Sequence, residues 1–225
     1  MVGLRRRQTG TNRALSQSPQ REPIVDGMIT NVNSANDAKW CAILPIKGGA
    51  QAKSRLGSNA KPAELANEFA KRTLTALLAC SEVENVNIVT ADEQWLAISA
   101  SRITTYKDPG NGLNAAICAA RDQMFENQYL VVVPSDLPLL DAAELACVLT
   151  EARAHSRAFV RDKDGDGTTL LTALKAEDLI PLYGRESAAA HLKSGASELA
   201  AGLSVRFDVD TLFDLTYLNR MDGNS

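Results

Sequence analysis

A continuous apolar run that ends at a single acidic residue most constrains how this chain folds. Residues 129–133 carry no charged side chain, and Pro134, Asp136 and Pro138 follow them. Such a run is typical of a central parallel strand that helices cover on both faces, and proline ends a strand because it cannot donate to the ladder. Ligands of open α/β sheets bind beyond the carboxyl ends of the strands. We therefore expect Asp136 at the ligand-binding edge, where a carboxylate suits Mg²⁺.

The rest of the chain alternates between strand-like and helix-like segments. Trp40–Ile46 and Val86–Thr90 are runs typical of strands, and apolar residues between about 62 and 80 recur at helical spacing. Downstream, we expect helices at 93–100, 113–125, 142–154, 187–193 and 212–218, and strands at 102–105, 158–161, 169–173 and 203–209. This alternation favours an α/β fold with a doubly wound, mostly parallel, Rossmann-like sheet.

The chain divides into a tail and one domain. Residues 1–38 are rich in Arg, Gln, Ser, Asn and Thr and show no periodicity, so we expect a flexible N-terminal tail. This tail is either a dispensable extension, with Met28 as the true start, or a binding segment. Residues 39–225 suffice for one domain with a sizeable core.

Composition and charge exclude several classes of function. The net charge of -3 argues against a nucleic-acid partner, and no apolar run is long enough to span a membrane. The basic N-terminus lacks the apolar segment of a secretory signal. The four cysteines form no C-x-x-C pair, which argues against a zinc ribbon and fits a reducing compartment. We therefore expect a cytoplasmic protein without nucleic-acid or membrane partners.

A second acidic site lies near the C-terminus, at Asp208 and Asp210. On an extended segment, side chains two residues apart point to the same side, about 7 Å from each other. Together with Asp136, these carboxylates predict a site for one or two divalent ions. The alternative is that one of the two aspartates caps a helix that begins near residue 212.

Basic residues follow the first expected strand. Lys47, Lys53 and Arg55 lie in a glycine-containing loop, which predicts a cradle for a polyphosphate. A solvated basic loop is the alternative. The loop is not a Walker A motif, because Ala52 stands where the second glycine must be, and the chain has no G-x-G-x-x-G dinucleotide motif.

Two motifs in the last third of the chain are candidates for anion binding. Residues 162–168 imitate the start of an EF-hand loop, but Ala173 stands where a bidentate glutamate must be, so we expect a tight turn that presents Thr168 to an anion. Ser187 opens an expected helix, either as the N-cap of an anion-binding terminus or as a cap alone. The G-x-S-x-G elbow of hydrolases is absent. His191 is therefore expected to support structure and not to act as a base.

A third motif opens the helix expected at 113–125. Gly112 and Asn114 flank the start of this helix, after a glycine-containing turn. They predict either a nucleobase contact through backbone and amide groups or a plain helix start.

Taken together, six motifs in order resemble the guanylyltransferases of coenzyme F-420 biosynthesis. They lie between about residues 40 and 217 and read L-P-I-K with A-K-S-R-L, G-L-N-A-A-I, P-S-D-L-P-L-L, D-G-T-T-L-L, Y-G-x-x-S-A-x-x-H and D-V-D-T-x-x-D-L. The resemblance implies the nucleotide-diphospho-sugar transferase fold, which molybdenum-cofactor guanylyltransferases share. One departure is Leu212-Phe213, where a proline is common in the family.

The resemblance also implies a reaction and the residues that serve it. GMP would move from GTP to a small phosphorylated carboxylic acid, and pyrophosphate would leave. The implied residues are Asp136, Asp208 and Asp210 for Mg²⁺, Thr168, Gly184 and Ser187 for the acceptor, Gly112, Asn114 and Ser135 for the nucleotide, and Lys47, Lys53 and Arg55 for catalysis.

The acceptor and the partners stay open at this point. Phosphoenolpyruvate is the expected acceptor, and 2-phospho-L-lactate and 3-phosphoglycerate are the alternatives. More distant alternatives are a molybdopterin nucleotidyltransferase, whose glycine-rich loop is missing here, and a nucleotide-binding module without turnover. A homodimer and hand-over of the product to the next enzyme of deazaflavin cofactor synthesis are further expectations that the sequence leaves open.

Overall fold

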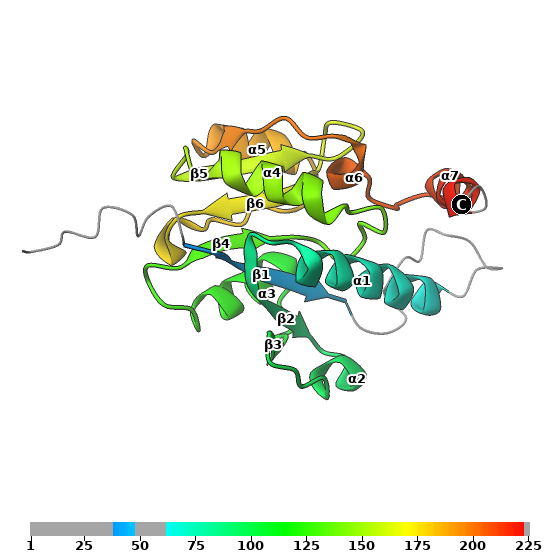
Figure 1. The fold of residues 1–225 in the computed structure, drawn as a ribbon, viewed down its shortest axis with the longest axis horizontal. Coiled ribbons are helices and arrows are strands. Elements are labelled where there is room, and N and C mark those ends of the chain that lie inside the picture. The colour runs from blue at the N-terminus through cyan, green and yellow to red at the C-terminus, as the bar shows by residue number, and fades with distance from the viewer. Residues whose placement is uncertain (1–37, 48–61, 223–225) are drawn as a thin grey trace, which may run out of the picture.

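The computed structural model describes residues 38–47 and 62–222. Within these residues, seven strands form one sheet in the order β3-β2-β1-β4-β6-β5-β7 (Figure 1). The strands are β1 (Trp40–Ile46), β2 (Val83–Thr90), β3 (Ile103–Lys107), β4 (Tyr129–Val132), β5 (Arg157–Arg161), β6 (Thr168–Ala173) and β7 (Ser197–Glu198). The helices are α1 (Pro62–Ala79), α2 (Glu93–Leu96), α3 (Leu113–Arg121), α4 (Ala142–Ala152), η3 (Ala176–Asp178), α5 (Ser187–Lys193), α6 (Leu203–Arg206) and α7 (Leu212–Asp222).

The sheet is mostly parallel, as predicted. Strand β1 lies parallel to β2 and β4, β2 parallel to β3, and β5 parallel to β7. Strand β6 runs antiparallel to both neighbours, β4 and β5. The connection from β5 to β6 is therefore a hairpin, and its turn lies at the same edge as the carboxyl end of β4.

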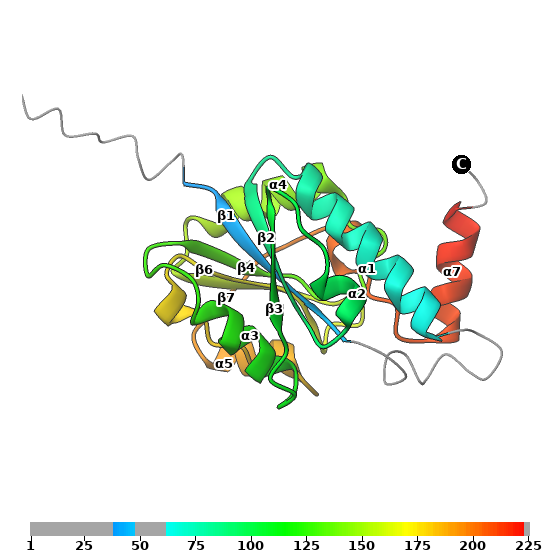
Figure 2. The ribbon, with the colours of Figure 1, turned by 90° about the horizontal axis from the view of Figure 1, so that it is seen from below.

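Helices cover both faces of the sheet (Figure 2). Because side chains alternate across a strand, the residues of β1 enter two separate cores. Trp40 and Leu44 pack with apolar residues of α1 and α4 on one face, whereas Cys41 and Ile43 pack with residues of α3 and α5 on the other. This arrangement confirms a doubly wound α/β fold, and it explains why the whole of β1 is buried.

A third, smaller core holds the C-terminal helix against the domain. Phe207, Val209 and Leu218 are buried with Phe69 of α1. Burial of Phe207 and Val209 fixes the extended segment between α6 and α7, so the aspartates that alternate with these residues face away from this core.

The prediction of a strand at 203–209 is wrong. Leu203–Arg206 forms the short helix α6, and only the following residues are extended. The free side of β5 is occupied by β7, which the sequence pattern did not predict, so no edge is left there for residues 203–209. The helices predicted at 93–100 and 113–125 are shorter than expected, since they end at Leu96 and Arg121.

No helix in the described ranges has the length and apolar character that a membrane crossing demands. The predicted tail, apart from Ala38, lies outside the described residues, as do Lys53 and Arg55.

The N-terminus of α4 offers a test of local stability. The Asp141 carboxylate accepts hydrogen bonds from the backbone N–H groups of Ala143 and Glu144, at 3.0 and 2.8 Å. We expect Asp141→Ala to lower the free energy of unfolding by about 1 kcal/mol, because it leaves two N–H groups without a protein acceptor. Urea unfolding measures this change. Glu151→Ala on the exposed part of the same helix is the control, and an equal loss in both variants would contradict the capping role.

Candidate active site

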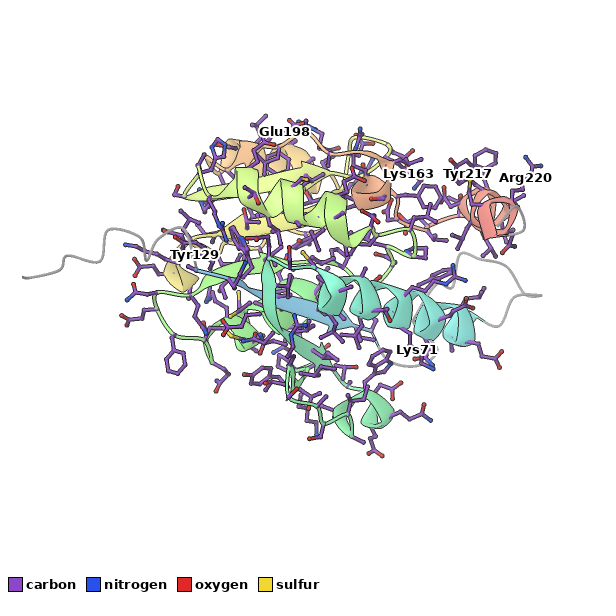
Figure 3. The ribbon with its side chains drawn as sticks, in the orientation of Figure 1. Lys71, Tyr129, Lys163, Glu198, Tyr217 and Arg220 are labelled. Atoms are coloured by element: carbon purple, nitrogen blue, oxygen red, sulfur yellow. The ribbon has the colours of Figure 1, made fainter. Side chains whose placement is uncertain are left out.

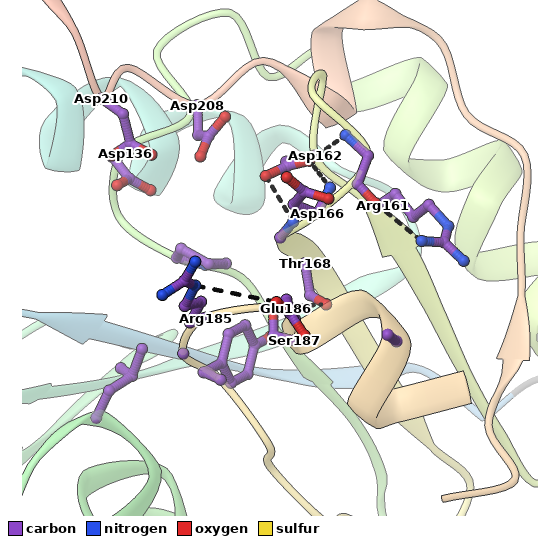
Figure 4. Close-up of a pocket in the computed structure, with 17 residues that line it drawn as sticks. Asp136, Arg161, Asp162, Asp166, Thr168, Arg185, Glu186, Ser187, Asp208 and Asp210 are labelled. Carbon is purple, nitrogen blue, oxygen red and sulfur yellow. Dashed lines mark hydrogen bonds and ion pairs between the residues drawn. The ribbon is translucent and has the colours of Figure 1, made fainter. Parts of the chain in front are cut away.

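A cavity of about 930 Å³ lies at the edge of the sheet where β4 ends (Figure 4). Five segments that are distant in sequence form its walls. They are the start of α3, the loop after β4, the turn between β5 and β6, the segment before α5, and the segment before α7. The cavity is therefore at the position predicted from the apolar run at 129–133.

Three aspartates converge on one end of this cavity. Asp136, Asp208 and Asp210 all line it, and Figure 4 shows their carboxylates near one another. The Val209 N–H donates to the Asp136 carbonyl oxygen at 3.1 Å, which ties the two segments together. Burial, followed by the nearby carboxylates Asp136 and Asp210, raises the pKa of Asp208 to about 7. The structure thus brings together the three predicted metal ligands.

Helix α7 is capped by a residue other than these aspartates. The Thr211 hydroxyl accepts from the Asp214 N–H at 3.2 Å, and the Asp214 carboxylate accepts from the Thr211 N–H at 2.8 Å. This reciprocal pair is a capping box. The alternative that Asp208 or Asp210 caps the helix is therefore not supported.

Lys163, in the turn of the β5–β6 hairpin, contacts one of the three cavity aspartates, Asp208. Its ammonium lies 3.1 Å from Asp208, 3.3 Å from Asp164 and 3.5 Å from Asp214, on the side of the molecule that carries α7 (Figure 3). Burial acts to lower the pKa of Lys163, but the carboxylates, Asp208 foremost, raise it above its ordinary value. Lys163 is thus a fixed positive charge that neutralises part of the acidic cluster.

The acidic cluster is not a complete metal site by itself. Among the side chains that the structure describes, no three His, Cys, Asp or Glu residues are arranged so that they alone could hold a metal ion. A cation here would therefore need further ligands, which water or the phosphate oxygens of a substrate can supply.

The opposite wall of the cavity carries hydroxyl groups. Thr168 begins β6 and Ser187 begins α5; both are buried, and the Ser187 hydroxyl donates to the Thr168 hydroxyl oxygen at 3.2 Å. Ser187 is not the N-cap, contrary to prediction, because Glu186 occupies that position at a φ of 55° without a side-chain capping bond. The Ser187 hydroxyl turns to Thr168 instead. Gly184 lines the same wall at a φ of 143°, a value that favours glycine.

The turn before Thr168 is tight, and one carboxylate organises it. Asp162 accepts hydrogen bonds from the N–H groups of Gly165, Asp166 and Gly167, at 2.6, 3.0 and 2.7 Å. A Cβ at Gly167 would clash with the carboxylate of Asp162, so a larger residue there would displace this carboxylate from the N–H groups that it binds. Sequence reasoning missed the role of Asp162, although the acidic, glycine-rich composition of the turn was a signal for it.

The predicted nucleotide contacts lie at the border of the cavity. Gly112 precedes α3 at a φ of 91°, and Leu113 lines the cavity. The Asn114 amide exchanges two hydrogen bonds of 2.9 Å with the backbone of Tyr183, so this side chain joins α3 to the segment before α5. Ser135 lies between two lining residues of the cavity, and a base contact by any of these groups stays a prediction.

Lys47 is the one predicted catalytic cation that the structure describes. It is exposed and directly follows β1, whose carboxyl end lies at the same edge as that of β4. This position agrees with a role near the cavity, and the contact itself stays a prediction.

Comparison with known proteins agrees with this geometry. A family model described as "Guanylyl transferase CofC like" matches residues 40–216. The chain belongs to this family. It is therefore a guanylyltransferase, and the nucleotidyltransferase activity predicted from its motifs is confirmed.

Similar proteins include a named relative and two solved structures. The chain is 41% identical to a phosphoenolpyruvate guanylyltransferase of Streptomyces coelicolor over 194 residues, which covers 79% of this chain and 88% of that protein. A Desulfovibrio desulfuricans protein assigned by its description to the nucleotide-diphospho-sugar transferases shares the fold, with a TM-score of 0.61 and 20% identity over 84% of this chain and 89% of that one. A Mycobacterium tuberculosis protein solved with manganese has a TM-score of 0.55 and 18% identity over 80% of this chain and 97% of that one. The nucleotidyltransferase-like fold is thus confirmed.

Proposed function

We propose that this guanylyltransferase transfers GMP from GTP to phosphoenolpyruvate in coenzyme F-420 biosynthesis and releases pyrophosphate. The observation that carries the proposal is the cavity itself, in which three carboxylates face a wall of hydroxyl groups across one space. Such a space accommodates a metal-bound triphosphate beside a small anionic acceptor. The relative from Streptomyces coelicolor, named phosphoenolpyruvate guanylyltransferase, supports this acceptor.

Asp136, Asp208 and Asp210 fit a divalent cation. They are oxygen donors, and burial together with the nearby carboxylates Asp136 and Asp210 raises the pKa of Asp208, so a bound cation would stabilise its charged form. These residues would hold Mg²⁺, the hard cation that carboxylates and phosphates share. When bound, Mg²⁺ would supply charge neutralisation at the α-phosphate.

The remaining chemistry requires positioning and no protein base. An acceptor phosphate oxygen attacks the α-phosphorus of GTP, a new P–O bond forms, and the bond to the pyrophosphate oxygen breaks. The acceptor phosphate is already an anion at neutral pH, so no proton has to be removed from it. Thr168, Gly184 and Ser187 hold the acceptor in line for this attack.

The nucleotide and its leaving group bind on the other side of the cavity. Lys47, together with Lys53 and Arg55 from outside the described residues, stabilises the departing pyrophosphate. Gly112, Asn114 and Ser135 remain the proposed nucleotide contacts. Cytoplasmic location, a homodimer and hand-over to the next enzyme of the pathway also remain proposals.

Pyrophosphate release across a panel of substrates tests this function. Four nucleoside triphosphates are combined with phosphoenolpyruvate, 2-phospho-L-lactate and 3-phosphoglycerate in the presence of Mg²⁺. We expect GTP with phosphoenolpyruvate to give the highest kcat/KM. Preference for 2-phospho-L-lactate would support the alternative acceptor, and no release with any pair would contradict all three acceptors.

Binding of a divalent cation is expected to depend on pH. Because the pKa of Asp208 is about 7, its carboxylate is protonated in mildly acidic solution and must lose that proton to bind a cation. We expect the Kd of Mn²⁺, measured by calorimetry without nucleotide, to fall by about 5-fold from pH 6 to pH 7, by about 10-fold in all by pH 8, and to change little above that pH. Asp208→Asn should bind weakly at every pH, and a wild-type Kd that does not change with pH would contradict this role.

The same group makes the stability of the metal-free protein depend on pH. A carboxyl whose pKa is raised on folding contributes stability that is present below its unfolded value of about 4 and is lost as the pH rises through about 7. We therefore expect the Tm of the metal-free protein to fall between these values by more in the wild type than in Asp208→Asn. Thermal unfolding in a chelating buffer checks this difference.

A further inference from the structure

The imidazole of His191 is buried behind the hydroxyl wall and engages both ring nitrogens. Its Nε2 lies 3.0 Å from the backbone nitrogen of Leu182, and its Nδ1 lies 3.0 Å from the Thr168 hydroxyl oxygen. The side chain is 0% exposed, and the rings of Phe159 and Tyr183 lie against it with centroids at 5.9 and 5.4 Å. The ring therefore has a fixed orientation.

The partner at Nε2 determines where the proton of the ring lies. A backbone N–H can only donate, so Nε2 accepts and carries no proton. Burial, with Arg157 nearby, lowers the pKa of His191 to about 4, so the ring is neutral near pH 7. A neutral imidazole carries one proton. That proton is on Nδ1, and His191 donates it to the Thr168 hydroxyl oxygen.

The Thr168 hydroxyl then has both its lone pairs occupied. It accepts one hydrogen bond from His191 and a second, of 3.2 Å, from the Ser187 hydroxyl. A hydroxyl oxygen has two lone pairs and one hydrogen. Because neither neighbour can accept that hydrogen in this arrangement, it is left for a group in the cavity that Thr168 lines.

We propose that His191 is a positioning residue that makes the Thr168 hydroxyl an obligatory hydrogen-bond donor toward the cavity. A fixed donor at this point selects an acceptor substrate with a carboxylate or phosphate oxygen there, because such an oxygen can only accept. The hydroxyl of Ser187 serves this arrangement by donating to Thr168. This inference rests on the proposed function in one respect, namely that the acceptor substrate binds at Thr168.

The first test observes the proton directly. The sequence contains two histidines, His155 and His191, so the ¹⁵N spectrum of labelled imidazoles shows two rings, and His155→Gln assigns them. We expect the wild-type His191 ring to be neutral, with the proton on Nδ1, between about pH 6 and pH 8. A proton on Nε2, or a charged ring, would overturn the proposal. This readout requires neither substrate nor turnover, so it is independent of the proposed function.

The second test uses two amide variants that each replace one ring nitrogen. In His191→Asn the amide nitrogen lies near the position of Nδ1 and can still donate to Thr168. In His191→Gln the amide carbonyl can accept from Leu182, but the donor to Thr168 is lost. We expect His191→Gln to raise the KM of phosphoenolpyruvate by about 10-fold or more, and His191→Asn to raise it by less than about 3-fold, with the KM of GTP unchanged in both.

The result separates positioning from a general structural role. Equal effects of the two amides, or an equal rise in KM for both substrates, would show that His191 only supports the fold and would overturn the proposal. The Nδ1 proton together with a KM effect confined to His191→Gln would support it. If the Nδ1 proton is found but phosphoenolpyruvate is not a substrate, the proposed function fails and the hydrogen-bond arrangement stands.

Discussion

Asp136→Asn and Asp210→Asn are each expected to lower kcat of the transfer reaction by at least about 10²-fold. The amide keeps the shape of the side chain but removes the negative charge that would hold a divalent cation. Both residues line the cavity and raise the pKa of Asp208. Pyrophosphate release at saturating GTP and phosphoenolpyruvate measures the loss.

The fold should survive both substitutions. The hydrogen bond that ties Asp136 to Val209 uses the backbone carbonyl, so it does not depend on the charge of the side chain. Removing one of three facing carboxylates also relieves repulsion, so the Tm of the metal-free protein should not fall. Asp122→Asn is the matched control because its side chain is 60% exposed beside Arg121 and does not line the cavity. Near-normal kcat in either cluster variant would refute the role of the aspartates in binding the cation.

Asp162→Ala is expected to damage both stability and acceptor binding. The carboxylate of Asp162 is the acceptor for three consecutive backbone N–H groups in the hairpin turn. Losing it leaves these groups without a protein partner, which costs about 2–4 kcal/mol in total when charge-assisted bonds are lost. Thr168 directly follows this turn, so we expect the KM of phosphoenolpyruvate to rise by about 10-fold or more while the KM of GTP changes little.

Asp164→Ala separates this effect from a simple change of charge. Asp164 lies in the same turn, its side chain is 70% exposed, and it pairs with Lys163 at 3.3 Å. We expect it to change the free energy of unfolding by less than about 1 kcal/mol, because the Asp164 carboxylate is exposed and Lys163 keeps its ion pairs with Asp208 and Asp214. If the two variants behave alike in urea unfolding and in the KM of phosphoenolpyruvate, the turn does not depend on the Asp162 hydrogen bonds.

The bounds were predicted best for strands that are completely buried and for helices that have a clear apolar face. Trp40–Ile46 and Ser187–Lys193 have the predicted bounds. Trp40–Ile46 lies in the interior, where an apolar run leaves few other solutions. Ser187–Lys193 buries one face, with Ser187, Ala188 and His191, and exposes the other. The strand predicted at 203–209 failed because Leu203, Val205 and Phe207 alternate as in a half-buried strand, although Leu203 is 47% exposed on a helix. Alternation of apolar and polar residues shows which side chains could be buried together. It does not reveal whether a neighbouring strand is available for backbone pairing.

Only part of the site was predicted, because sequence patterns reveal strand ends but not contacts between distant segments. Asp136 was found because it follows a strand that could be recognised, and parallel topology brings such ends to one edge. Lys163 and Asp162 were missed because their roles depend on contacts with Asp208 and with the turn backbone, which follow only from the path of the hairpin. His191 was expected to support structure, but its hydrogen bond to Thr168 joins residues that lie 23 positions apart and could not be read from spacing.

The antiparallel direction of β6 has a consequence for how acceptor preference can diverge among relatives. Because β5 and β6 are joined by a hairpin, one continuous stretch of chain, 157–173, supplies the turn with Asp162 and Lys163 and also Thr168. A short insertion or deletion in this turn alters one side of the cavity and leaves the order of the other strands untouched. A transplant of this stretch between members with different acceptors is therefore a compact way to exchange substrate choice while the nucleotide half of the enzyme stays the same.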